Sequence, residues 1–213
     1  MLRTPLLLVA LASGLVLVVL GVTVAGTATP GPWDAWARTT LLLLPDARHA
    51  ALLIDGAGEP IGVVVLCGLL AIGCLAFQRG RLAVLAVVSQ GVVGAASTLL
   101  KPVFGRTIHD GFLSYPSGHA AGPTALAIVA ALLVVTVLRV GRVLALVVVF
   151  VAVTTVGAVA AAAQIWLYSH YATDTVGGFC LAAALVIPLA RLVDHVAERV
   201  GVTPDPVSGR VSR

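Results

Sequence analysis

Six long apolar stretches set the limits on what this chain can fold into. They cover approximately residues 6–26, 61–77, 82–100, 120–138, 143–167 and 175–192. A helix needs about 20 apolar residues to cross the hydrocarbon core of a bilayer, where its backbone groups must be bonded internally. Only 10% of the residues are charged, whereas soluble domains carry about 25%. The sequence therefore predicts an all-α integral membrane protein, a bundle of six transmembrane helices.

The basic residues indicate how these helices are oriented, because positively charged loops stay in the cytoplasm. One side of the predicted membrane carries nine of the thirteen basic residues. They are Arg3, Arg79, Arg81, Arg139, Arg142, Arg191, Arg199, Arg210 and Arg213. The sequence thus predicts a multi-pass protein of the cell membrane with both termini in the cytoplasm. The outer ends of the third to sixth spans would then lie together on the outer face.

The first outer connection, residues 27–60, is the longest and is rich in both tryptophan and leucine. Trp33 and Trp36 suit helices that lie in the membrane interface, with indole rings at headgroup level. Such helices can be a lid or ramp that gates lipid access, or a surface-anchored connector, and the sequence favours the connector. His49 in this stretch has no evident partner and is expected to be an ordinary surface histidine.

Two regions are predicted along the chain. Residues 1–193 form the six-span membrane domain, and residues 194–213 form a cytoplasmic tail. The tail begins as a short charged helix, and its remainder, "GVTPDPVSGRVSR", is polar enough to be disordered.

Composition also excludes several classes of site. Cys67, Cys74 and Cys180 all lie inside apolar stretches, so we expect small packing residues and no disulfide. No set of metal ligands with suitable spacing accompanies them. The scattered arginines and few aromatic residues give no sign of a nucleic-acid surface, and the oligomeric state is left undetermined.

The loop "KPVFGRTIHDGFLSYPSGH" before the fourth span has the residues of a phosphate cradle. Lys101 and Arg106 supply positive charge. Ser117, Gly118 and His119 begin the helix, where unpaired N–H groups and the helix dipole favour an anion. Ser117 adds a hydroxyl donor, and Gly118 lets a ligand approach the backbone closely. Alternatively, Ser117 is only a helix cap and the cations contact lipid headgroups.

A second group of polar residues, "SHYATD", precedes the sixth span. His170 and Asp174 are four residues apart and share a face of a helical turn. A carboxylate bonded to one ring nitrogen leaves the other as a nucleophile able to attack phosphorus. His119 is then the available acid for the leaving alkoxide. Alternatively, Asp174 is an N-terminal helix cap beside an unrelated histidine.

Together, Lys101 with Arg106, the segment 116–119 (Pro-Ser-Gly-His) and His170-x-x-x-Asp174 resemble the three motifs of the type 2 phosphatidic acid phosphatase superfamily. Its integral-membrane branch has six spans and an active site at the outer face. The resemblance implies His170 as nucleophile, Asp174 as its orienting partner and His119 as general acid. Lys101, Ser117 and Gly118 would bind phosphate, and no metal or other cofactor is implied.

The chain departs from the family pattern at two arginine positions. Counting from Lys101, the first motif's Arg-Pro falls on Ile108 and His109, so Arg106 would have to serve instead. The third motif's Ser-Arg is replaced by Ala163 and Gln164. The Gln164 amide can donate a hydrogen bond to substrate but brings no charge.

The expected function is hydrolysis of a lipid phosphate or diphosphate at the outer leaflet through a phosphohistidine. Candidate substrates include polyprenyl diphosphates, phosphatidate, phosphatidylglycerol phosphate and polyprenyl-phosphoryl sugar phosphates. The alternative is a protein of the same fold that binds or transports lipid phosphates without turnover.

Overall fold

The computed structural model describes residues 3–43, 47–109 and 111–201, and these residues are predominantly helical. The helices are α1 (Arg3–Val24), α2 (Pro32–Leu41), α3 (Arg48–Gly58), α4 (Pro60–Ala76), α5 (Gly80–Phe104), α6 (Gly118–Val137), α7 (Arg142–Trp166) and α8 (Ala172–Arg199). Two short antiparallel strands, β1 (Thr107–Ile108) and β2 (Phe112–Leu113), join α5 to α6.

The predicted spans correspond to α1, α4, α5, α6, α7 and α8. In the described part of the chain, five helices are long and apolar enough to cross a membrane. The sixth candidate is α3 and α4 taken together, a pair bent by 70° in which α4 corresponds to the predicted span. The prediction of an all-α membrane bundle is therefore confirmed, with α2 and α3 as the extra helices expected in the first outer connection.

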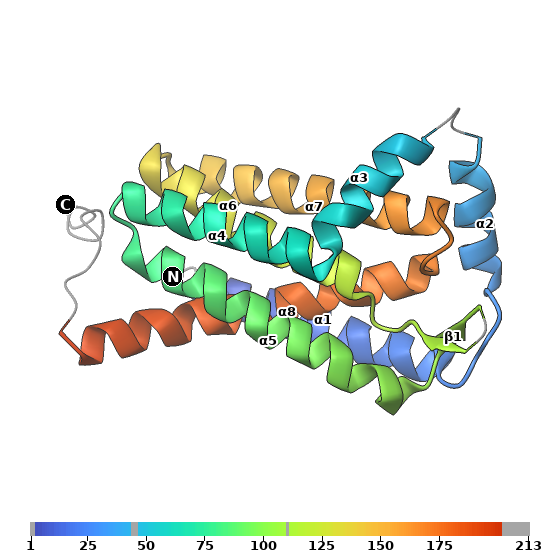
Figure 1. Cartoon of the computed structure of the whole chain (residues 1–213). Helices are drawn as coiled ribbons and strands as arrows, with labels where there is room; N and C mark the ends of the chain where they lie inside the picture. The colour runs from blue at the N-terminus through green and yellow to red at the C-terminus, as the bar shows by residue number, and fades with distance from the viewer. Residues whose placement is uncertain (1–2, 44–46, 110, 202–213) are drawn as a thin grey trace.

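The central helix of the bundle is α6, which packs against α5, α7 and α8 (Figure 1). Of its most apolar window, 61% is buried inside the protein, against 17% for α1 and for α7. Small residues allow this close packing, because Ala120, Ala121 and Ala125 are fully buried where neighbouring helices meet. The outer helices expose valine and leucine side chains, as expected for a surface in contact with lipid.

The two ends of the bundle differ in the elements they contain. The N-terminus and the C-terminal end of α8 lie at one end, together with the α4–α5 and α6–α7 turns (Figure 1). Helices α2 and α3 and the β1–β2 hairpin lie at the opposite end. The arginine-rich turns are therefore separated by the length of the bundle from the loops that carry the predicted site.

Several smaller predictions can also be compared with the structure. All three cysteines are buried, as expected of small packing residues, and His49 is exposed on α3. Residues 194–199 continue α8 without a break. The predicted disorder of the remaining tail concerns residues 202–213, which lie outside the described part of the chain.

Candidate active site

The predicted site residues come together at one end of the bundle from three places. Lys101 is in the last turn of α5, His119 is in the first turn of α6, and His170 lies between α7 and α8. The rings of His119 and His170 are 6.0 Å apart between centroids. This is close enough for one small ligand to touch both rings.

The start of α6 offers backbone donors, as the sequence predicted, but fewer than expected. Ser117 caps the helix by accepting a hydrogen bond from the Ala120 N–H at 3.3 Å. The Ser117 N–H is itself bonded to the Asp174 carbonyl at 3.0 Å and is not free for a ligand. The N–H groups of Gly118 and His119 bond to no described residue. These two donors, with the Ser117 hydroxyl proton, make up the cradle.

Two glycines of α8 allow that helix to pack directly on the cradle. A Cβ atom at Gly178 would lie 2.2 Å from the Ser117 carbonyl oxygen, and one at Gly177 would lie 2.5 Å from the Tyr115 ring. Any larger side chain would push α8 away from the start of α6. The "GG" that follows Asp174 in the sequence thus fixes the distance between the two halves of the site.

His170 is buried, with its Nδ1 atom 3.7 Å from Asp174 Oδ2. This is an ion-pair distance, longer than a hydrogen bond, and Nδ1 has no hydrogen-bond partner among the described residues. Burial lowers the pKa of His170 below its usual value, although the Asp174 carboxylate opposes this effect. The ring is therefore neutral near pH 7 and keeps a nucleophilic lone pair.

Asp174 forms the helix cap that one interpretation of the sequence predicted, and it lies near His170 without the hydrogen bond that the other predicted. Its Oδ2 accepts a hydrogen bond from the Tyr171 N–H at 2.9 Å and so caps α8. The same carboxylate faces the His170 ring. Capping and orientation are thus compatible roles of one side chain.

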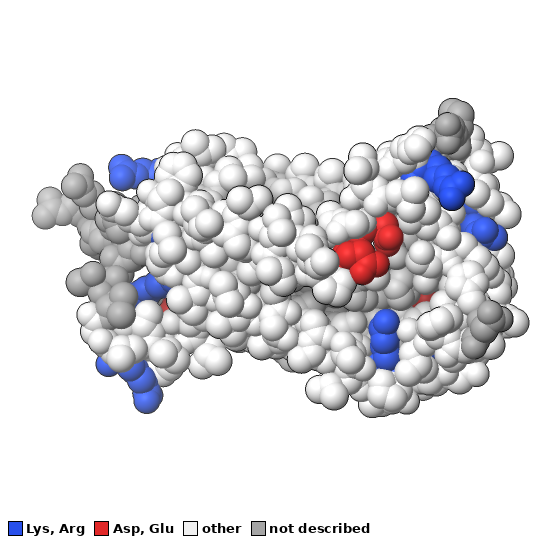
Figure 2. All heavy atoms as spheres, viewed as in Figure 1, with Lys and Arg blue, Asp and Glu red and all other residues white. Residues whose placement is uncertain are grey.

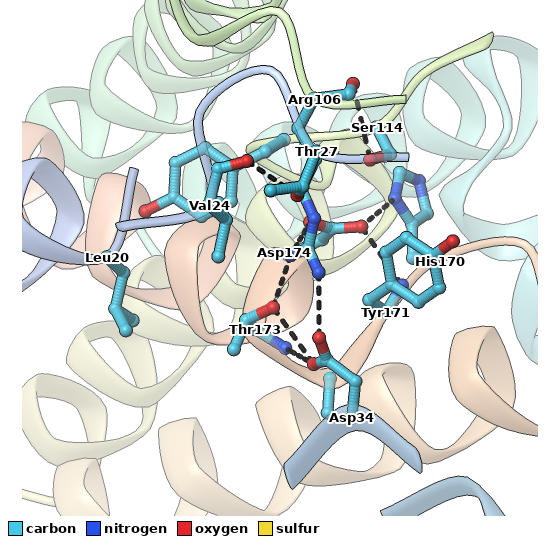
Figure 3. Close-up of polar contacts among 12 residues, drawn as sticks. Leu20, Val24, Thr27, Asp34, Arg106, Ser114, His170, Tyr171, Thr173 and Asp174 are labelled. Atoms are coloured by element: carbon cyan, nitrogen blue, oxygen red, sulfur yellow. Dashed lines mark hydrogen bonds and ion pairs between the residues drawn. The ribbon is translucent and has the colours of Figure 1, made fainter. Parts of the chain in front are cut away.

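A buried network, here called the arginine cluster, holds Asp174 in place (Figure 3). It comprises Arg106, Asp34, Thr173 and Asp174. The Arg106 guanidinium donates to Asp174 Oδ1 and to Asp34 Oδ2, each at 2.7 Å, and also bonds Thr173. Arg106 is only 1% exposed and lies over the Tyr171 ring.

This position differs from the one that the sequence analysis gave Arg106. Both terminal nitrogens of its guanidinium are bonded to carboxylates, so the group is turned toward Asp34 and Asp174. A buried arginine paired with two carboxylates stabilises their ionised forms. This geometry suits a positioning role for Arg106, which would act on His170 through Asp174.

Asp34 was not identified from the sequence as a site residue. It lies in α2, where burial raises the pKa of its carboxyl, but hydrogen bonds from Thr173 and Arg106 outweigh burial and lower it. Asp34 Oδ1 also accepts from the Thr173 N–H at 2.8 Å. The sequence signal was only an acid in the first turn of a predicted interfacial helix, 72 residues before its arginine partner.

A second group, here called the His119 cluster, contains His119, Asp55, Glu59 and Gln164. His119 Nε2 lies 3.4 Å from Glu59 Oε1 and 3.8 Å from Asp55 Oδ1. Gln164, at the end of α7, donates from Nε2 to Asp55 Oδ1 at 2.7 Å. Two carboxylates of the first outer connection therefore line the site, and the sequence analysis did not predict them.

The remaining predicted residues take two different positions. The Lys101 ammonium group is partly buried, forms no hydrogen bond or ion pair with a described residue, and acts electrostatically on Asp174 and His170. His109 instead turns to the Tyr168 carbonyl, 2.8 Å from Nε2. Ile108 is buried in the hairpin. Of the positions in the first motif, only Lys101 offers an unpaired charge.

Comparisons with known proteins agree with the fold described above. A sequence model described as the PAP2 superfamily matches residues 4–197. Among solved structures, the chain is similar to a transmembrane PAP2-type phosphatidylglycerolphosphate phosphatase from Bacillus subtilis. The TM-score is 0.71 at 19% sequence identity, covering 89% of this chain and 98% of the other. No curated protein sequence matches the chain.

Proposed function

Because the chain belongs to the PAP2 superfamily, we propose that it is a membrane phosphatase that hydrolyses a lipid phosphate or diphosphate through a phosphohistidine. The main support for this proposal is that His119 and His170 lie close together beside the unbonded N–H groups of Gly118 and His119. The Asp174 carboxyl group lies 3.7 Å from His170 Nδ1, and the His119 ring lies 6.0 Å from the His170 ring.

In the first step, His170 attacks the phosphorus. Its Nδ1 faces Asp174, so Nε2 forms the N–P bond while the bond from phosphorus to the leaving oxygen breaks. His119 gives its proton to that oxygen. The resulting phosphohistidine is cationic, and the Asp174 carboxylate stabilises it once the 3.7 Å separation shortens.

In the second step, water attacks the phosphorus on the opposite side from His170. Its proton passes to His119, the N–P bond breaks, and inorganic phosphate leaves. The N–H groups of Gly118 and His119 and the Lys101 charge stabilise the phosphoryl oxygens in both steps. No step requires a metal, so chelators should leave the activity unchanged.

An apolar cavity supports a lipid as the substrate. It has a volume of about 540 Å³ and lies between α3, α4, α6 and α7. Ala57 lines this cavity, and the next residue, Gly58, contacts His119: a Cβ atom there would lie 2.9 Å from the imidazole. A hydrocarbon chain in this cavity would place its phosphate near His119. The positively charged turns at the opposite end of the bundle support a site on the outer face.

The second candidate function is binding or transport of lipid phosphates without turnover. Two observations favour it: Gln164 brings no charge to the site, and Asp55 and Glu59 add negative charge beside His119. A neutral contact in place of a charged one costs about 1–2 kcal/mol of phosphate binding. That corresponds to roughly tenfold in rate, which slows a reaction but does not abolish it.

Purified protein assayed for phosphate release separates the two functions. The substrate panel is phosphatidate, phosphatidylglycerol phosphate, a polyprenyl diphosphate and a polyprenyl-phosphoryl sugar phosphate. We expect release from at least one of them, lost in His170→Ala and kept in His195→Ala, an exposed histidine near the other end of α8. Binding of these lipids without release would favour the second candidate.

A further inference from the structure

The two carboxylates beside His119 are the least expected feature of this site. Asp55 and Glu59 come from the end of α3 and the residue that follows it. Figure 2 shows acidic side chains gathered on the surface where α3 meets α4. Among the described residues, no lysine or arginine lies within ion-pair distance of either carboxylate. Their negative charge therefore faces a site that has to accept a phosphate, and it is not balanced there.

The donor atoms of the cluster are spaced as ligands of one cation would be. Asp55 Oδ1, Glu59 Oε1 and His119 Nε2 all lie within 4.8 Å of one another. Two of the separations are 3.4 and 3.8 Å. A point equidistant from three such atoms lies about 2.4 Å or less from each, which is the range of metal–ligand bonds in proteins.

Gln164 supplies an independent sign of a ligand. The side chain is 1% exposed and is directed at the cluster through its bond to Asp55. Its other amide atom, Oε1, is buried and has no hydrogen-bond partner among the described residues. Leaving a buried carbonyl oxygen unbonded costs about 1–3 kcal/mol. Rotation of the amide by half a turn would bring this oxygen to the position beside Asp55 now taken by the nitrogen.

We propose that Asp55, Glu59 and His119 bind a divalent cation, with the Gln164 amide oxygen as a further ligand. Two carboxylates, one imidazole and one amide oxygen form a mixed oxygen and nitrogen set that suits Mn²⁺ or Zn²⁺. The cation neutralises the charge of the two carboxylates and satisfies the buried oxygen of Gln164.

The site has a regulatory consequence that rests on the proposed function. A His119 nitrogen bonded to a metal holds no proton there and cannot accept one. A bound cation therefore withdraws the general acid, and it inhibits the phosphatase without touching His170. Inhibition of this kind is compatible with a reaction that needs no metal, because removing the cation leaves His119 free.

Calorimetric titration of Mn²⁺ into the chelator-treated, purified full-length protein tests the site without any substrate. We expect saturable binding that weakens at least about tenfold in Glu59→Gln and is unchanged in His195→Ala. Glu59 is half-exposed, so this substitution is not expected to unfold the protein. Absence of Mn²⁺ binding, or equal binding by wild type and Glu59→Gln, would overturn the proposal.

Phosphate release then tests the consequence. Mn²⁺ should inhibit the wild type, and about tenfold more Mn²⁺ should be needed to inhibit Glu59→Gln, with each protein compared with its own activity in the absence of metal. Inhibition at the same Mn²⁺ concentration in both proteins would contradict the regulatory role. Mn²⁺ binding without any phosphate release would refute the proposed function and leave the cation site standing. Phosphate release by a protein that binds no Mn²⁺ would refute the cation site and leave the proposed function standing.

Discussion

The arginine cluster and the His119 cluster are neighbours at one end of the bundle. The carboxylates of the two clusters differ in their burial and in the groups that pair with them. In the arginine cluster, Asp34 and Asp174 are fully buried and share one guanidinium. In the His119 cluster, Asp55 and Glu59 are partly exposed and pair with a histidine and with the neutral amide of Gln164, but with no lysine or arginine among the described residues.

This difference indicates that the arginine cluster is a structural element, whereas the His119 cluster is a place where ligands can bind. Buried charges must be paired within the protein, and pairing fixes their positions. Charges left unpaired at a partly exposed site are available to whatever binds there. The first cluster therefore sets the geometry of His170, and the second determines which ligands His119 meets.

The largest expected effect comes from removing the cation of the arginine cluster. Arg106→Met leaves two buried carboxylates without a cation to pair with, which should cost about 3–5 kcal/mol of stability and misplace Asp174. The midpoint of thermal unfolding in detergent should fall markedly, and phosphate release should fall with it. The control from the other cluster is Glu59→Gln, for which we expect a change within about 0.5 kcal/mol. Equal midpoints for the two variants would remove the distinction between the clusters.

A smaller effect is expected from giving the His119 cluster an arginine of its own. Gln164→Arg supplies the charge that the family pattern has at this position and pairs it with Asp55. We expect roughly a tenfold gain in kcat/KM for lipid phosphates, together with weaker Mn²⁺ inhibition. A loss of activity would indicate a pocket shaped around the amide. Unchanged kinetics and unchanged inhibition would show that Gln164 is not part of the site.

Much of the fold was predictable because lipid imposes a simple rule on sequence. Each predicted span corresponds to a helix, and the ends agree closely for 120–138 and α6 (Gly118–Val137). The exception is the end of the sixth span, predicted near residue 192, because α8 continues to Arg199. Lipid demands long apolar helices, so length and hydropathy suffice to find them. The two-residue strands β1 and β2 were not predicted, since pairs this short leave no periodic pattern.

The site was predictable where its residues are close in sequence and not where they meet through the fold. The segment 116–119 and the His170–Asp174 pair are local patterns that carry their own chemistry. Arg106 was expected to bind substrate, but the structure pairs it with Asp34, which lies in another helix far along the chain. No local pattern distinguishes such a pairing from a solvated charge.

The first outer connection illustrates the same limit. Its helices α2 and α3 were expected, and a role as a surface-anchored connector was favoured. The structure instead brings Asp34, Asp55 and Glu59 from this segment to the site residues. The apolar residues of the segment were enough to predict helices at the membrane interface. The contacts of its acidic residues depend on the folded structure and could not be predicted from the sequence.

The central claim is that His170 carries the phosphoryl group, and trapping this intermediate tests it most directly. Protein mixed with a lipid substrate labelled with radioactive phosphorus is quenched in denaturant at high pH, where phosphohistidine survives, at times within the first turnover. We predict label on His170 in the wild type and in His195→Ala, and none in His170→Ala. Phosphate release by the wild type with no labelled protein at any time, or equal labelling of His170→Ala, would contradict the account.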